Sequence, residues 1–128
     1  MSAMALLSPT VAHRSPTTNE AVTGRCRGAL SWTVQPHGEL TRITLVGELD
    51  TATAPALDAY VGPLAEAGHD LVVDLAELRF CSCAGLTLFM QWRSRATITG
   101  GSLCLLAPAR IVHRLLTVTG TLELLTCR

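Results

Sequence analysis

The chain has 128 residues, of which 48% are hydrophobic and 16% are charged. This size suits one domain with a substantial core. Ten basic and ten acidic residues give a formal net charge of zero, so the chain lacks the positive field on which binding to nucleic acid or to anionic membranes depends. All the basic residues are arginine, which excludes Schiff-base chemistry, a P-loop lysine and a receiver-type phospho-aspartate switch.

The longest apolar stretches fall far short of the roughly 20 residues that cross a bilayer. The first residues lack the charged start and the apolar run of a signal peptide. The sequence therefore predicts a cytoplasmic protein without a membrane segment. The cysteine count is odd and most of the cysteines stand in apolar runs, which indicates buried, reduced thiols. The cysteines are Cys26, Cys81, Cys83, Cys104 and Cys127.

Residues 1–28 are rich in Ser, Thr, Pro, Ala and Gly and show no apolar period. They are predicted to form a flexible tail before an ordered domain over residues 29–128. Residues 30–34 and 42–46 predict two strands. The turn signal Pro36-His37-Gly38 lies between them and predicts an antiparallel hairpin.

The spacing of apolar residues predicts the remaining elements. In chain order they are a helix from Pro55 to Gly68, a strand over 71–75, a helix over 83–97, a strand over 102–106, a helix from Pro108 to Gly120, and a short strand or frayed end over 122–127. Pro63 is expected to kink or shorten the first helix. The order β-β-α-β-α-β-α-β predicts an α/β domain with a mixed sheet of four to five strands and three main helices.

The segment from Phe80 to Leu86 joins a predicted buried strand to a helix. Ser82 suits the N-cap of that helix. The free N–H groups and the positive dipole end of the helix favour an anion or a carboxylate nearby, and Gly85 permits close approach to the backbone. The same residues also suit a plain capped helix start without any binding role.

Two other features carry alternative chemistry. Cys81 and Cys83 are a possible metal pair, or a source of a nucleophile with His69 or His113 as the base, although the chain has no second cysteine pair and no assignable triad. Asp50 follows a predicted strand, where ligands gather in α/β sheets. A helix-capping or loop role is the alternative for Asp50.

Three stretches in order resemble the STAS family, the domain of bacterial anti-sigma-factor antagonists, over residues 29–125. Residues 46–57 contain Gly47-Glu48-Leu49-Asp50 and a helix entry of small residues. Residues 71–86 contain the strand with Val73-Asp74-Leu75 and the turn from Phe80 to Leu86. Residues 101–120 contain the pattern from Gly101 to Pro108 and the ending Thr119-Gly120. The resemblance implies a STAS-like mixed sheet flanked by three main helices.

The resemblance also implies a mechanism. An anti-sigma factor that is a serine kinase binds such an antagonist at the turn before the second helix, and it phosphorylates the Ser or Thr that precedes the turn glycine. Here Ala84 occupies the acceptor position and Ser82 stands where the family has an aspartate. No phosphorylation is therefore expected, with Ser82 as a weak alternative acceptor.

The function expected from the resemblance is binding of a serine-kinase-type anti-sigma factor, without catalysis, metal or cofactor, and with the chain as a monomer or weak dimer. The expected partner-binding residues are Asp50, Thr51, Ser82, Cys83, Ala84, Gly85 and Leu86. A STAS scaffold or small-ligand-binding module in a regulatory assembly is the alternative. A small cysteine-dependent enzyme is a third reading, for which loss of activity on thiol alkylation would be the sign.

Overall fold

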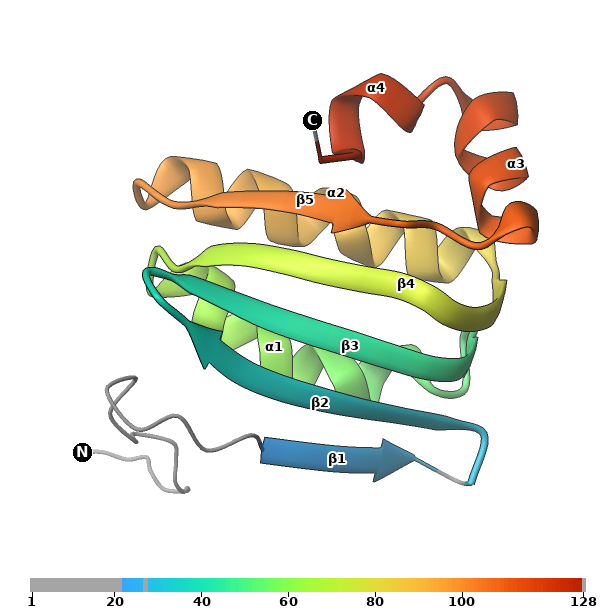
Figure 1. Cartoon of the computed structure of the whole chain (residues 1–128), viewed down its shortest axis with the longest axis horizontal. Coiled ribbons are helices and arrows are strands. Elements are labelled where there is room, and N and C mark those ends of the chain that lie inside the picture. The colour runs from blue at the N-terminus through green and yellow to red at the C-terminus, as the bar shows by residue number, and fades with distance from the viewer. Residues whose placement is uncertain (1–21, 27, 128) are drawn as a thin grey trace.

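The computed structural model describes residues 22–26 and 28–127. The strands form a single mixed sheet, and helices connect its later strands (Figure 1). The strands are β1 (Val22–Cys26), β2 (Leu30–His37), β3 (Leu40–Leu49), β4 (Asp70–Cys81) and β5 (Ser102–Leu106). The helices are α1 (Ala54–Glu66), α2 (Cys83–Ile98), α3 (Arg110–Thr119) and α4 (Leu122–Leu125).

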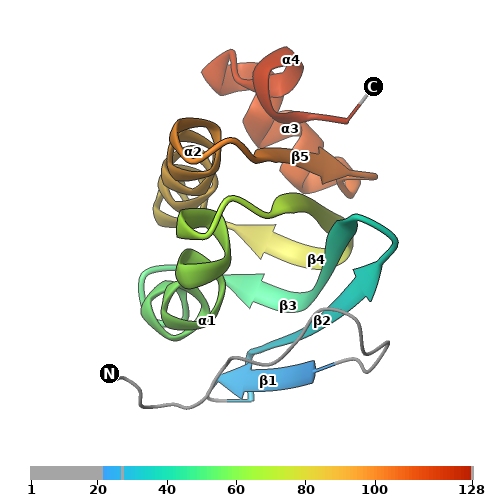
Figure 2. The ribbon, with the colours of Figure 1, turned by 90° about the vertical axis from the view of Figure 1, so that its left-hand side faces the viewer.

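The strands lie in the order β1-β2-β3-β4-β5. The first three pair antiparallel, whereas β3, β4 and β5 pair parallel. The two parallel pairs require crossovers, which α1 and α2 supply, and Figure 2 shows both helices on the same side of the sheet. The predicted α/β class, with a mixed sheet and three main helices, is therefore confirmed, and so is the hairpin at Gly38.

The core lies between this sheet and the two helices. Alternate residues of each strand point towards α1 and α2 because side chains alternate along a strand. The buried strand residues facing the helices include Leu30, Trp32, Val34, Ile43, Leu45, Leu49, Leu71, Val73, Leu75, Leu103 and Leu105. The apolar strand patterns seen in the sequence therefore mark one covered face.

The two helices are joined by a polar contact that helical periodicity does not reveal. Trp92 of α2 is fully buried, and its Nε1–H donates to Asp58 Oδ1 of α1 at 2.8 Å. The Arg95 guanidinium lies 3.5 Å from the same carboxylate oxygen. The N–H of a buried indole usually has an acceptor, and for Trp92 helix α1 supplies it at the helix–helix contact.

Helices α1 and α3 lie where the apolar spacing predicts them, but that spacing does not decide which of their residues are buried or how far α1 continues. Ile111 of α3, an apolar residue, is 54% exposed, while Val112 and Leu116 are buried. Helix α1 is not shortened at Pro63, since it continues to Glu66 and ends just before Gly68. Periodicity identifies a helix correctly but leaves the angular width of its buried face to the neighbours that pack against it.

The sheet begins earlier than predicted. Residues 22–26, expected in the flexible tail, form β1 and pair with β2. Gly24 lies opposite Trp32, and a Cβ atom at Gly24 would stand 2.2 Å from the indole ring. The ring thus occupies the space that a side chain would take, so β1 is positioned by a tertiary contact and not by an apolar alternation of its own. Residues 1–21 and residue 27 of the predicted tail lie outside the described residues.

The predicted last strand is also wrong in its main part. Residues 122–125 form α4, and only Thr126 makes a bridge, parallel to Leu105. The Cys127 N–H then donates to the Leu105 carbonyl at 2.8 Å. The fully buried side chain of Leu125 fixes this return of the chain alongside β5.

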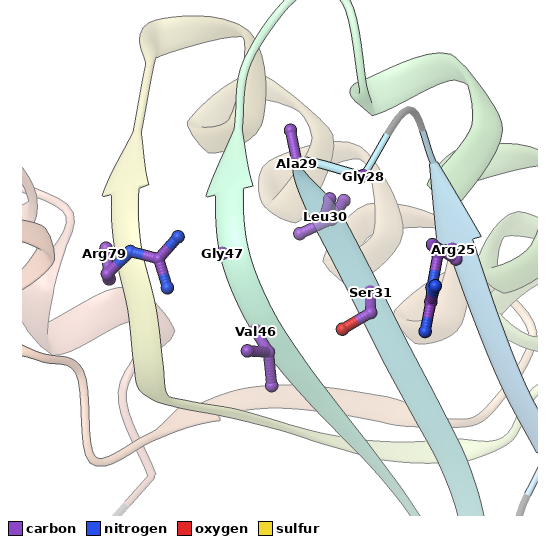
Figure 3. A pocket seen from close by; sticks show the side chains of 8 residues that line it. All are labelled: Arg25, Gly28, Ala29, Leu30, Ser31, Val46, Gly47 and Arg79. Atoms are coloured by element: carbon purple, nitrogen blue, oxygen red, sulfur yellow. The ribbon is translucent and has the colours of Figure 1, made fainter.

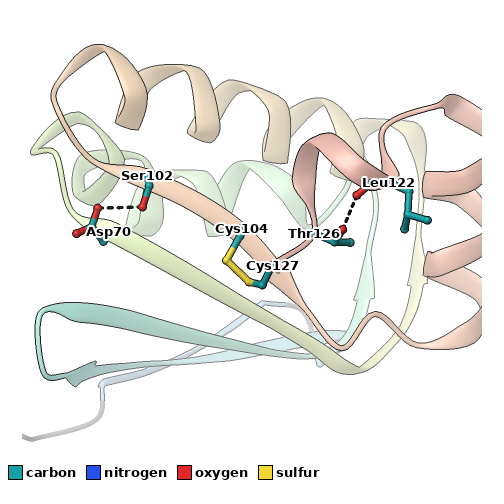
Figure 4. The surroundings of a disulfide bond; sticks show 6 residues. All are labelled: Asp70, Ser102, Cys104, Leu122, Thr126 and Cys127. Carbon is teal, nitrogen blue, oxygen red and sulfur yellow. Dashed lines mark hydrogen bonds between the residues drawn. A yellow bond between two sulfur atoms is a disulfide. The ribbon is translucent and has the colours of Figure 1, made fainter.

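This return corrects the expectation that Cys104 is buried and reduced. Cys104 is half-buried and forms a disulfide with Cys127, with their Cα atoms 4.9 Å apart (Figure 4). The side chains of Leu103 and Leu105 face the core, so Cys104 between them points to the opposite face, where Cys127 arrives. This Cα separation is within the range that a disulfide spans.

We expect protein purified without reductant to contain one disulfide-linked pair of tryptic peptides, residues 96–110 and 115–128. Cleavage after Arg95, Arg110 and Arg114 separates the two cysteines, so only the disulfide joins these peptides. Alkylation after unfolding should mark three cysteines, and five after reduction, since Cys26, Cys81 and Cys83 are free. Five marked cysteines before reduction would contradict the pairing.

Candidate functional site

The two segments singled out in the sequence meet at one edge of the sheet. Strands β3 and β4 run parallel with Leu49 opposite Cys81, so the chain leaves both strands at the same end. The Ser82 N–H donates to the Leu49 carbonyl at 2.9 Å and holds the two exits together. The turn at Asp50 and Thr51 therefore lies beside the start of α2.

Ser82 is the N-cap of α2, as predicted. Its backbone is extended and its Oγ accepts a hydrogen bond from the Ala84 N–H at 3.2 Å. The Ser82 carbonyl accepts the first intrahelical bond, from the Leu86 N–H at 3.1 Å. The hydroxyl of Ser82 thus satisfies one of the free N–H groups at the helix start.

Gly85 sets the close approach of α2 to the strand ends. A Cβ atom at this position would lie 2.7 Å from the Cys81 Sγ and 2.9 Å from two side-chain carbons of Leu49. Such distances are shorter than van der Waals contact, so only glycine lets the first turn of α2 pack here. Gly85 and Leu86 are both buried, which makes them the base of the turn and not its outer surface.

Asp50 is engaged in its own turn. Its Oδ1 accepts hydrogen bonds from the Ala52 N–H at 2.9 Å and the Thr53 N–H at 3.0 Å. The Thr53 Oγ1 accepts from the Asp50 N–H at 3.0 Å and donates to the Glu48 carbonyl at 3.1 Å. Asp50 therefore has the loop role that the sequence offered as an alternative, since it stabilises the turn before α1, whose N-cap is Thr53. Thr53, a buried polar residue, completes the turn, and the Asp-x-x-Thr spacing was its signal in the sequence.

The outer surface of this edge is formed by the remaining residues. Thr51 and Cys83 are exposed, while Asp50, Ser82 and Ala84 are half-buried. Phe80, directly before the turn, is 43% exposed. The edge thus presents a small polar and apolar surface at the ends of two adjacent parallel strands.

Cys81 and Cys83 have opposite environments. Cys81 is buried, and burial together with the neighbouring Cys83 thiol raises the pKa of Cys81 to about 12. His69 lies at the other end of the 12-residue strand β4, about 40 Å of extended chain away. Within residues 22–26 and 28–127 no cluster of three or more His, Cys, Asp or Glu is placed to hold a metal ion.

We expect iodoacetamide at pH 8 to modify Cys83 in the native protein while Cys81 stays protected. Only about one Cys81 thiol in 10,000 is ionised at that pH with a pKa near 12. Peptide mapping after timed alkylation measures both sites, and the C83S variant identifies the Cys83 product. Equal rates of modification at Cys81 and Cys83 would show that Cys81 is not buried.

The comparisons with known proteins agree with this architecture. The family model described as "Mlab, STAS domain" matches residues 32–126. The chain belongs to the STAS domain family, and the resemblance seen in its motifs is confirmed. No helix in the described part of the chain is long and apolar enough to cross a membrane.

Two individual relatives within this family have a named function. An anti-sigma-B factor antagonist of Bacillus subtilis (strain 168) is 31% identical over 84 residues, covering 66% of this chain and 77% of the relative. An anti-sigma-B factor antagonist of Staphylococcus epidermidis is 29% identical over 90 residues, covering 70% of this chain and 83% of the relative. The curated relatives are thus antagonists of anti-sigma factors.

Solved structures share the fold. An anti-sigma factor antagonist from Mycobacterium paratuberculosis superposes with a TM-score of 0.68 at 24% identity, covering 78% of this chain and 86% of that one. The anti-sigma factor antagonist SpoIIAA in its unphosphorylated form gives a TM-score of 0.61 at 19% identity, covering 74% of this chain and 85% of that one. At these identities the likeness concerns the fold.

Proposed function

We propose that this chain is an anti-sigma-factor antagonist, which binds an anti-sigma factor of the serine-kinase type and thereby influences sigma-factor-dependent transcription. The observation that carries the proposal is its similarity to curated anti-sigma-B factor antagonists over two thirds of the chain. The chain acts by contact and not by catalysis. It works in the cytoplasm as a monomer or weak dimer, without nucleic acid, membrane or cofactor.

The contact surface in this proposal is the edge where β3 and β4 end. Thr51 and Cys83 lie outermost, and Asp50, Ser82 and Ala84 complete the surface between them. Gly85 and Leu86 are buried under this surface, and they contribute by packing the turn against the sheet. The hydrogen bond from the Ser82 N–H to the Leu49 carbonyl supports this arrangement, because it holds the turn after β3 beside the turn after β4.

The proposal includes the absence of the usual switch. Ala84 offers no hydroxyl at the acceptor position, and the Ser82 Oγ stands two residues earlier, where it caps α2. A phosphate adds nearly two negative charges and breaks a packed interface by repulsion and desolvation. Without an acceptor the contact stays insensitive to the partner's kinase activity.

We expect ATP to leave binding of a serine-kinase-type anti-sigma factor unchanged for the natural sequence, and the A84D variant to weaken it by at least about tenfold. The aspartate places an unpaired charge in the interface. Binding is measured by calorimetry with and without ATP, and intact-mass spectrometry detects any phosphate. The A84S variant should fold, because a small hydroxyl in a first helical turn costs little stability.

The matched control is S94D, which places the same charge at an exposed site on α2 outside the turn. This variant should bind like the natural sequence. A stoichiometric phosphate on the natural sequence that releases the partner would overturn the assignment of Ala84. Failure to bind any anti-sigma factor of its own cell, with the fold intact, would overturn the proposed function itself.

A further inference from the structure

The sheet face away from α1 and α2 carries a hollow of about 240 Å³ that the proposed function does not use. It lies across β1, β2, β3 and β4 near the turn that joins β1 to β2 (Figure 3). The lining residues are Arg25, Gly28, Ala29, Leu30, Ser31, Val46, Gly47 and Arg79. The hollow thus combines two guanidinium groups and a hydroxyl with a floor that is largely backbone.

The strand register places the polar groups on one face. Arg25 pairs with Ser31, and Ser31 pairs with Val46, so these side chains form a row across the sheet. Arg79 reaches into the hollow from β4, and Figure 3 shows its guanidinium turned towards Gly47. Strands β1 and β4 are three spacings apart, roughly 14 Å, and an arginine side chain extends roughly 6 Å. One small group bound between them is within reach of both arginines.

Neither arginine has an ion-pair partner among the described residues. Elsewhere on the same face Arg42 is paired with Asp74, and between the helices Arg95 is paired with Asp58. Glu77 lies beside Val46 in the register, but it does not line the hollow and forms no ion pair with Arg79. The two unpaired cations therefore face the hollow without an internal counter-charge.

Two of the residues that line the hollow are glycines, so these positions contribute no side chain to it. Gly28 has a φ of 70°, and a Cβ atom there would meet nothing within 4 Å. Gly47 has a φ of 113°, and a Cβ atom there would stand 2.1 Å from the Ala29 carbonyl oxygen. The Ala29 carbonyl excludes a side chain at Gly47, so no side chain from this position fills the hollow.

We propose that this hollow binds a phosphate-type oxyanion, held by the guanidinium groups of Arg25 and Arg79 and by the Ser31 hydroxyl. Guanidinium groups match the oxygens of a phosphate with paired, charge-assisted hydrogen bonds. The volume is below the roughly 300–1,000 Å³ of pockets that enclose a whole small molecule. The site thus takes a single phosphate, either free or at the end of a ligand whose remainder stays in solvent.

The test is a titration of the full ¹⁵N-labelled chain at constant ionic strength, followed by amide shifts, with inorganic phosphate in one arm and glycerol phosphate in the other. Saturable shifts should centre on Gly28, Ser31 and Gly47. The R25Q and R79Q variants should each weaken binding by at least about tenfold, the loss expected when one charge-assisted hydrogen-bonding group is removed. Similar binding in both arms shows that the phosphate group alone is recognised, and tighter binding of the ester shows that a phosphorylated ligand is preferred.

Arg114, an exposed arginine of α3 outside the hollow, provides the matched control, and R114Q should leave the affinity unchanged. R79K keeps the positive charge but loses the paired N–H donors of the guanidinium group. Its affinity for phosphate should lie between those of the natural sequence and R79Q. All variants are checked for unchanged amide dispersion. Shifts that do not saturate, that miss the hollow, or that respond equally to R25Q, R79Q and R114Q would overturn the proposal. None of these outcomes depends on binding of an anti-sigma factor.

Discussion

Replacing Trp92 by alanine is expected to lower the free energy of unfolding by about 3–5 kcal/mol, the usual cost of removing a large aromatic side chain from a core. Trp92 is fully buried and its ring lies 5.8 Å from that of Phe89, measured between centroids. It also donates its N–H to Asp58 across the contact between α1 and α2. Urea denaturation followed by circular dichroism measures the change.

A comparison with the other tryptophan, Trp32, distinguishes the contribution of packing to stability from that of the hydrogen bond. Trp32 is also buried, but its Nε1–H finds no acceptor among the described residues. Conversion to phenylalanine removes similar volume at both sites, and only W92F loses a hydrogen bond to a carboxylate. W92F should therefore cost about 1–3 kcal/mol more than W32F. An equal cost for the two variants would show that the Asp58 contact contributes nothing to stability.

The G85A variant is expected to lose about 1–3 kcal/mol of stability, the typical cost of overpacking, even though alanine is the better helix former by about 1 kcal/mol. The added methyl group would overlap the Cys81 Sγ and the Leu49 side chain. G85V should be affected more strongly because it adds two further carbons. Because the turn at Ser82 rests on this contact, partner binding in the proposed function should fall as well.

Two variants test the cause of this effect. In a C81A background the methyl group of G85A meets one neighbour fewer, so the substitution should cost less there than in the natural sequence. The control G62A adds a methyl group at a buried glycine of α1 that faces the side-chain ends of Asp58 and Arg95 at 3.0 and 3.2 Å. These ends can shift, so G62A should cost less than G85A. A neutral G85A would contradict the close packing of α2.

The sequence alone was sufficient for the elements whose signals are local. The Gly38 turn set the hairpin, Gly68 and Gly120 marked the ends of two helices, and Ser82 was recognised as an N-cap from its position before an apolar helix. Each signal acts within a few residues through backbone angles or a cap, so it can be read without tertiary contacts. The grouping of Asp50 with Ser82 was implied only by the family resemblance, and the parallel pairing of β3 with β4 in the structure accounts for it.

What the sequence left open was decided by contacts between distant segments. Strand β1 depends on the Trp32 ring that covers Gly24, and the C-terminal return depends on Leu105 and Cys104, more than 20 residues earlier. At the site, Gly85 was expected at a binding surface and lies instead against Leu49 and Cys81 beneath it. Burial and disulfide pairing depend on which surfaces meet, and only the packing of sheet against helices determines that.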